Sequence, residues 1–265
     1  MPEYVRLRRD GTISGRPVRT SAVERELTML KGALNWARRT YEHGKPLLQS
    51  NPLEAYRIPS ERDPKRPVVT DASLDALLAV AEGVHPMLRT LIVLASGTGR
   101  RLSAILNLRW EDVDFEAGSI RWRAEHDKLR RTSVIPASEE VLAELRRYRA
   151  ARPGLGAALL FPHPKHRRHP DQPVTRHLAA YWLKRAYSAS GAAKPDGSLW
   201  HAFRRRWATD RTSLSVKDVA AAGGWKDVST LIECYQQPDT ETLRQVVDFR
   251  KTSPANGPRA RSASH

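Results

Sequence analysis

The spacing of the apolar residues limits this chain to a mainly helical fold with one short stretch of sheet. In most segments apolar side chains recur every three or four residues, which places them on one face of a helix. Between positions 112 and 136 the period becomes two, and polar residues alternate with Val113, Ile120, Trp122 and Val134. We therefore expect an α+β protein that is mainly α-helical and contains a small antiparallel β-sheet.

A charged, proline-containing stretch from Ser60 to Pro67 has no apolar pattern and is interpreted as a linker. Before it, a capping box at Ser21 predicts a helix over 22–42, and Asn51-Pro52 predicts the start of a short second one. Five parts are expected: a basic arm over 1–20 that is disordered or loosely packed until it meets a partner, a partial helical domain over 21–60, the linker over 61–67, a larger domain over 68–250 and a disordered tail over 251–265.

The charge balance predicts a polyanionic partner. Lys and Arg number 45 against 29 Asp and Glu, a formal net charge of +16, although a generically basic protein would show the same excess. No apolar run is long enough to span a membrane, and no signal peptide opens the chain. The one cysteine, Cys234, excludes an internal disulfide and a zinc site built on several cysteines, so we expect a cytoplasmic protein.

The C-terminal part concentrates the residues that could carry chemistry. His201 and Arg204 stand three apart, so a helix would place them on the same face, where both could bind one anion. Trp225 and Tyr235 follow, and a tyrosine, with a reference pKa of about 10, becomes a useful nucleophile only near dense positive charge. The alternatives are an exposed polar pair, two core aromatics and, for Cys234, a packed thiol.

Three further basic segments are either solvated surface or binding sites for an anion, a nucleic acid or a metal. Arg100 and Arg101 follow the Gly97-Thr98-Gly99 break, where exposed backbone N–H groups favour a phosphate. Lys128 lies in the predicted hairpin turn, where it is either a solvated lysine or one that reaches into a nucleic-acid groove. The run from His163 to Pro170 holds three histidines but no Cys or carboxylate at ligand spacing, which favours a solvated basic loop over a metal site.

Together these segments resemble the catalytic domain of the tyrosine recombinases, the phage-integrase family, over residues 68–250. The family's first arginine box is similar to T-G-R-R-L-S at 98–103, followed by L-N-L-R-W-E-D-V-D at 106–114. The H-x-x-R box and G-G-W-K-D are also present, and residues 22–60 resemble more faintly the end of the helical core-binding domain. The residues that match the family's catalytic positions are Arg101, Lys128, His201, Arg204, Trp225 and Tyr235.

The resemblance implies a site-specific recombinase that cuts and rejoins double-stranded DNA through a 3′-phosphotyrosyl intermediate, with neither metal nor ATP. It makes the two arginines phosphate ligands, Lys128 the general acid and Tyr235 the nucleophile. It also implies a homotetramer on paired sites, helped by DNA-bending or directionality factors, and association with the nucleoid when DNA is bound. Further DNA contacts are expected from Arg100, Arg130, Arg131, Arg205 and Arg206.

Three departures from the family pattern keep other functions open. Ala104 stands where relatives often have an acid, Tyr235 lies one residue further from Trp225 than is common, and the N-terminal helical domain is short. A DNA-binding regulator or remnant with weakened catalysis would fit these departures. A relaxing enzyme similar to the type IB topoisomerases would use the same phosphotyrosine chemistry.

Overall fold

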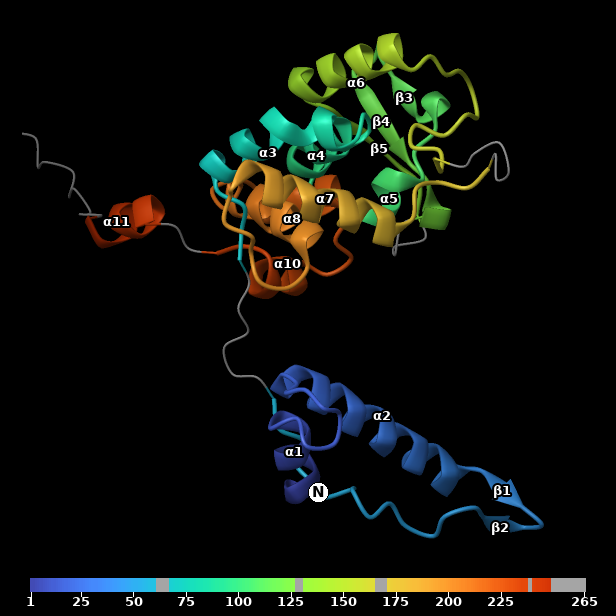
Figure 1. Cartoon of the computed structure of the whole chain (residues 1–265). Helices are drawn as coiled ribbons and strands as arrows, with labels where there is room; N and C mark the ends of the chain where they lie inside the picture. Colours follow the sequence, from blue (N-terminus) through green and yellow to red (C-terminus); the bar gives the residue numbers. More distant parts are fainter. Residues whose placement is uncertain (61–66, 127–130, 165–170, 238–239, 249–265) are drawn as a thin grey trace, which may run out of the picture. The chain divides into compact units, whose positions relative to one another are not determined.

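The computed structural model of the protein describes residues 1–60, 67–126, 131–164, 171–237 and 240–248 (Figure 1). Its contacts divide the chain into two compact units, Met1–Lys65 and Arg66–His265. The division between Lys65 and Arg66 falls within the stretch that the sequence marks as a linker. The predicted tail over 251–265 lies outside the described residues, as does most of the linker.

The smaller unit consists of α1 (Pro2–Arg9), α2 (Thr20–Arg39) and a short hairpin of β1 (Tyr41–Glu42) and β2 (Lys45–Pro46). The expectation of a loose arm is wrong for residues 2–9, which form a helix. Polar contacts anchor it, since the Tyr4 hydroxyl donates to the Glu26 carboxylate at 2.8 Å and Arg8 Nε donates to it at 2.9 Å. Because polar side chains hold this helix in place, it shows no apolar period in the sequence, and the pattern did not predict it.

The second helix predicted from Asn51 is also wrong, because residues 52–55 form turns. The Asn51 side chain does cap, but it caps a turn: its Oδ1 accepts from the Leu53 amide at 2.8 Å. Its Nδ2 donates to Asn35 Oδ1 on α2 at 2.7 Å, so this asparagine ties the turn to the long helix. An asparagine that caps a turn and an asparagine that caps a helix look the same in the sequence, which explains the wrong prediction.

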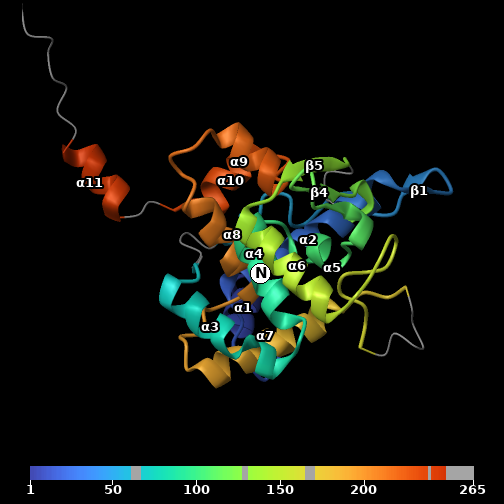
Figure 2. The ribbon, with the colours of Figure 1, turned by 90° about the horizontal axis from the view of Figure 1, so that it is seen from above.

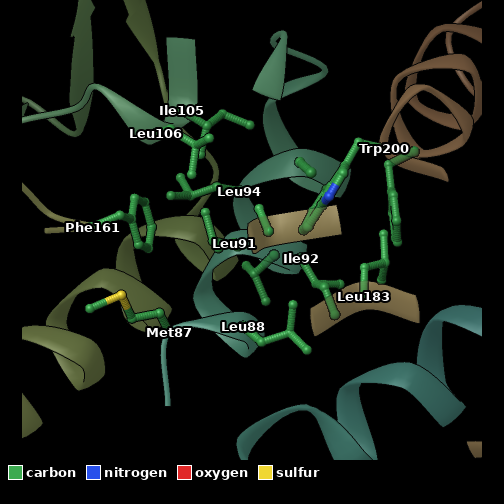
Figure 3. Close-up of a cluster of buried hydrophobic side chains, with 14 of the residues drawn as sticks. Met87, Leu88, Leu91, Ile92, Leu94, Ile105, Leu106, Phe161, Leu183 and Trp200 are labelled. Atoms are coloured by element: carbon green, nitrogen blue, oxygen red, sulfur yellow. The ribbon is translucent and has the colours of Figure 1, made fainter. Parts of the chain in front are cut away.

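The larger unit begins with α3 (Asp71–Val84), α4 (Leu88–Thr98) and α5 (Leu102–Leu106) and continues after the sheet with α6 (Glu139–Ala151) and α7 (Arg176–Ser190). α4 is the central helix: it packs against α3, α6 and α8 (Leu199–Thr209), and its side chains from Leu88 to Ala95 are all buried except Arg89. Figure 3 shows Leu88, Leu91, Ile92 and Leu94 of α4 in this core. A helix that is apolar on all sides is accommodated only in such a central position.

The sheet holds three antiparallel strands in the order β3 (Val113–Asp114), β4 (Ser119–Trp122) and β5 (Ser133–Pro136), all labelled in Figure 1. Figure 2 shows β4 and β5 from above. Ile120 pairs with Ile135, and the side chains of Ile120 and Trp122 are buried, as the alternating pattern predicts. The predicted fold class, mainly α with a small antiparallel sheet, is therefore confirmed.

The last described residues form three short helices, α9 (Val216–Gly223), α10 (Val228–Cys234) and α11 (Thr240–Asp248). α9 and α10 pack on the end of α8 around a second small core of Trp207, Val219, Trp225 and Leu231. None of the helices in the described ranges combines the length and the apolar character needed to cross a membrane.

Candidate functional site

Arg204 is the centre of the candidate site and is almost completely buried, with 1% of its surface exposed. Its guanidinium donates to the backbone carbonyls of Gly99, Gly223 (2.6 Å) and Gly224 (3.5 Å). Its Cζ lies 3.5 Å from the centre of the Trp225 ring, a cation–π contact. Burial lowers the pKa of Arg204 to about 9, and the charge of Arg101 acts in the same direction. At neutral pH the group is still charged.

Arg101 reaches the same place from another part of the chain. α4 ends at Gly99 in the left-handed conformation (φ 62°), and this break turns the backbone into the extended Arg101 at the start of α5. From there Arg101 Nη1 donates to the Gly224 carbonyl at 3.0 Å. Two guanidinium groups from segments about a hundred residues apart therefore share one backbone turn.

His201 lies one helical turn before Arg204 on α8, as the sequence spacing predicts. Burial first, and then the charges of Arg204, Arg205 and Arg101, lower its pKa to about 4. The imidazole is consequently neutral at pH 7 and carries one free lone pair, so it can accept a proton as well as donate a hydrogen bond.

Tyr235 directly follows the last residue of α10, and its ring lies beside these groups. The ring centroid is 6.3 Å from that of His201 and 5.3 Å from Arg204 Cζ, and the ring meets Trp225 edge-on at 5.0 Å. Trp225 is 96% buried, stacks on Trp207, and its indole N–H has no acceptor among the described residues. The phenol and the buried guanidinium thus lie side by side within one protomer.

A pocket of about 600 Å³ opens on this cluster, lined by Arg101, His201 and Arg204 together with side chains of α7. Two of the latter, Arg176 and His177, were not singled out from the sequence. The signal was present in the T-R-H sequence at 175–177: a predicted helix that opens with basic residues and has no acid in its first turn.

With this geometry in view, comparison with known proteins decides the family. Residues 67–242 match the model of the phage integrase family. The chain belongs to that family. Over 200 residues it is 26% identical to the tyrosine recombinase XerA of Thermococcus kodakarensis, covering 75% of this chain and 68% of XerA. It is 28% identical to the tyrosine recombinase XerC of Syntrophus aciditrophicus over 147 residues, 54% of this chain and 45% of that protein.

Solved structures of other integrases and recombinases share the fold. The DNA complex of the Tn1549 transposon integrase superposes with a TM-score of 0.67 at 18% identity, covering 93% of this chain and 83% of the other. The XerH recombinase bound to a difH substrate gives a TM-score of 0.70 at 17% identity, covering 92% and 70%. At these identities the likeness concerns the fold.

The other arginines predicted to contact DNA make contacts within the integrase-family domain. Arg100 is 97% buried: its Nη2 donates to Ser133 Oγ and to the Ala221 carbonyl, both at 3.2 Å. Arg205 Nη1 donates to the Pro67 carbonyl at 3.2 Å, and Arg206 pairs with the carboxylate of Asp71. These three side chains tie α8 and the break between α4 and α5 to their surroundings, and a DNA contact by any of them stays a prediction.

The hairpin turn lies largely outside the described residues, which exclude both Lys128 and Arg130. Arg131 is described and exposed. Most of the histidine-rich run after His163 is outside as well. Within the described ranges, no group of three or more His, Cys, Asp or Glu side chains is arranged to hold a metal ion.

The depressed pKa of His201 predicts a pH dependence of stability. The unfolded chain, with a histidine pKa near 6.5, takes up a proton before the folded chain, whose His201 pKa is about 4. This histidine's contribution is therefore complete above pH 6.5 and is lost as the pH falls toward 4. We expect denaturant titrations of the wild type and His201→Gln to diverge in that window, with the wild type losing more stability. Parallel curves would show that the imidazole is not held neutral.

Tight packing around Gly223, beside the site, leaves no room for a larger residue. A Cβ at this position would lie 1.9 Å from Trp225 Cζ3, so Gly223→Ala must displace the indole. We expect a loss of about 2 kcal/mol of unfolding free energy, the usual cost of overpacking, and a changed tryptophan fluorescence. The matched control is Gly83→Ala in α3, where an added Cβ meets nothing within 4 Å and should stabilise by up to about 1 kcal/mol. Equal effects of the two substitutions would contradict the packing.

Proposed function

We propose that this chain is a site-specific DNA recombinase that cleaves and rejoins DNA through a 3′-phosphotyrosyl link. The observation that carries the proposal is the position of the Tyr235 ring beside His201 and Arg204 in one protomer. A phenol next to a buried guanidinium and a neutral imidazole has what a phosphodiester cleavage requires: a nucleophile, a proton acceptor and a ligand for the phosphate.

The family assignment and the charge support a DNA substrate. XerA and XerC are named tyrosine recombinases, and the solved structures of the Tn1549 integrase, lambda integrase and XerH are complexes with DNA. The net charge of +16 gives this chain the electrostatics that such a partner needs. We infer that the substrate is double-stranded DNA and that the backbone of one strand enters the pocket.

In the proposed reaction the Tyr235 oxygen attacks the phosphorus, and the phenolic proton passes to neutral His201. The bond from phosphorus to the 5′ oxygen breaks, and its electron pair leaves with that oxygen. Lys128 then supplies the proton that makes the 5′-hydroxyl, a role that rests on the family resemblance. Arg101 and Arg204 hold the non-bridging oxygens, on which negative charge accumulates.

Attack by a 5′-hydroxyl from another strand reverses these steps and restores a phosphodiester. The energy of the broken bond is kept in the phosphotyrosine, so resealing requires no ATP. Trp225, as an indole, has only an N–H to offer, and in this scheme it donates to the phosphate or packs the site.

Exchange between two sites requires several protomers, and we propose a homotetramer on paired sites. α11 carries Leu243, Val246 and Val247 with at least half of each side chain exposed. An apolar helix face of this kind suits docking on a neighbouring protomer. Deletion of residues 237–265 should then abolish synapsis and spare binding to a single site, and unchanged synapsis would exclude this role.

The proposal is tested with a nicked suicide substrate taken from the direct repeats that flank the gene. We expect a covalent protein–DNA adduct on a denaturing gel, and peptide mass spectrometry should place the nucleotide on Tyr235. Binding to the site without an adduct would instead indicate a regulator that has lost catalysis. Relaxation of supercoiled plasmid of any sequence by a monomer would indicate an enzyme similar to the type IB topoisomerases.

A further inference from the structure

The pocket extends well beyond the groups that the proposed reaction uses. Arg101, His201 and Arg204 lie on the side formed by α5 and α8, whereas Arg176 and His177 line the side formed by the first turn of α7. The cleavage chemistry gives these α7 residues no part. The cavity therefore has a second cationic wall that still lacks a function.

We propose that Arg176 binds a second backbone phosphate of the DNA, the neighbour of the phosphate under attack on the same strand. This inference rests on the proposed function, because it needs a DNA strand in the pocket. Successive phosphates of one strand follow each other by about 3.4 Å along the helix axis, so a strand whose scissile phosphate meets Arg204 places the next one beside it.

The start of α7 combines a helix N-terminus with basic side chains, and both favour an anion. A helix N-terminus carries partial positive charge and favours acids, as in α3 with Asp71 and in α6 with two glutamates. The first turn of α7 has no acid and instead carries Arg176 and His177. Such an arrangement is unfavourable in the empty protein and becomes favourable when a phosphate is bound there.

Arg176 is also available for such a ligand. Its side chain is exposed and forms no hydrogen bond or ion pair with the described residues. The guanidinium N–H groups of Arg176 therefore have no acceptor among the described residues and can bind a ligand in the pocket.

The charge of Arg176 already acts on the proposed reaction centre, since it is one of the four arginine charges that lower the pKa of His201. A phosphate bound at Arg176 would offset that charge. The second phosphate would therefore position the strand and reduce the electrostatic repulsion within the pocket.

The first test measures binding of a short duplex of unrelated sequence over a range of salt concentrations. Arg176→Gln is expected to weaken binding about tenfold at low salt, as for one lost charge-assisted contact. The slope of log K against log salt should fall by about 0.9. The matched control is Arg185→Gln, an exposed arginine on the opposite side of α7 about two and a half turns further along, which should change neither quantity. Equal effects of the two variants would overturn the inference.

The second test places a neutral methylphosphonate on either side of the scissile phosphate in the suicide substrate. One of the two positions should weaken wild-type binding about tenfold and leave Arg176→Gln unchanged, the non-additivity expected of a direct contact. If, at both positions, the methylphosphonate weakens binding of Arg176→Gln by the same factor as binding of the wild type, Arg176 does not contact either phosphate.

The two proposals can fail separately. If the wild type forms a Tyr235-linked adduct but the methylphosphonate weakens both proteins by the same factor, the proposed recombinase function is retained and the second phosphate site is excluded. If the wild type forms no adduct, the proposed function falls, and the salt slope of Arg176→Gln still decides the phosphate contact.

Discussion

Replacing Tyr235 by Phe is expected to abolish the covalent protein–DNA adduct and leave DNA affinity unchanged. The substitution removes only the hydroxyl, so the edge-on packing of the ring against Trp225 is retained. Loss of a nucleophile typically costs roughly 10⁴-fold or more in rate, which takes the adduct below detection on a denaturing gel. Affinity is measured on the same DNA by gel shift.

The control for this experiment is the neighbouring thiol. Cys234 is half-buried and lies at the end of α10, so Cys234→Ala should form the adduct at the wild-type rate. An adduct that survives in Tyr235→Phe and disappears in Cys234→Ala would transfer the nucleophile to the cysteine and remove the basis of the proposal.

The second large effect is expected from Arg204→Ala, which should lose both activity and stability. Truncation leaves the carbonyls of Gly99, Gly223 and Gly224 without their buried donor. Each unsatisfied buried group costs about 1–3 kcal/mol, and relief of the repulsion from Arg101 offsets part of this cost. We expect a net loss of about 3 kcal/mol, or a Tm lower by roughly 6–12 °C for a domain of this size.

Arg204→Lys separates the two losses. A lysine keeps the positive charge but cannot reach several carbonyls with a planar fork, so it should recover part of the stability and little of the adduct. Scanning calorimetry and the suicide-substrate assay provide the two readouts. A stable Arg204→Ala variant would show that the carbonyl contacts do not hold the α8–α9 region together.

Much of this arrangement could be predicted from the sequence because it depends on local periods. The alternation around Ile120 and Trp122 marks a half-buried sheet, and the three-residue spacing of His201 and Arg204 places both on one face of α8. That Arg101 and Tyr235 come together with them was expected from the family resemblance, since no local pattern connects such distant segments.

Contacts made by single polar side chains could not be predicted in this way. Glu26 holds the first helix, and Asn51 fixes a turn, through bonds that have no period. The spacing from His201 singles out Arg204 among three successive arginines on α8, but the sequence names no partner for any of the three. The structure gives them different partners, because Arg204 points to the glycine turns while Arg205 and Arg206 reach Pro67 and Asp71.

Arg204 is held by peptide oxygens and, among the described residues, has no carboxylate partner. Every amino acid brings the same carbonyl, so mutation at positions 99 and 223 cannot delete these acceptors. Room is limited at both positions, since a methyl group would collide with Trp207 or Trp225, and at Gly99 the left-handed backbone (φ 62°) disfavours other residues as well. The hold on Arg204 therefore does not pass through any acidic side chain that the structure describes; it depends on two glycines that leave space for the indole rings.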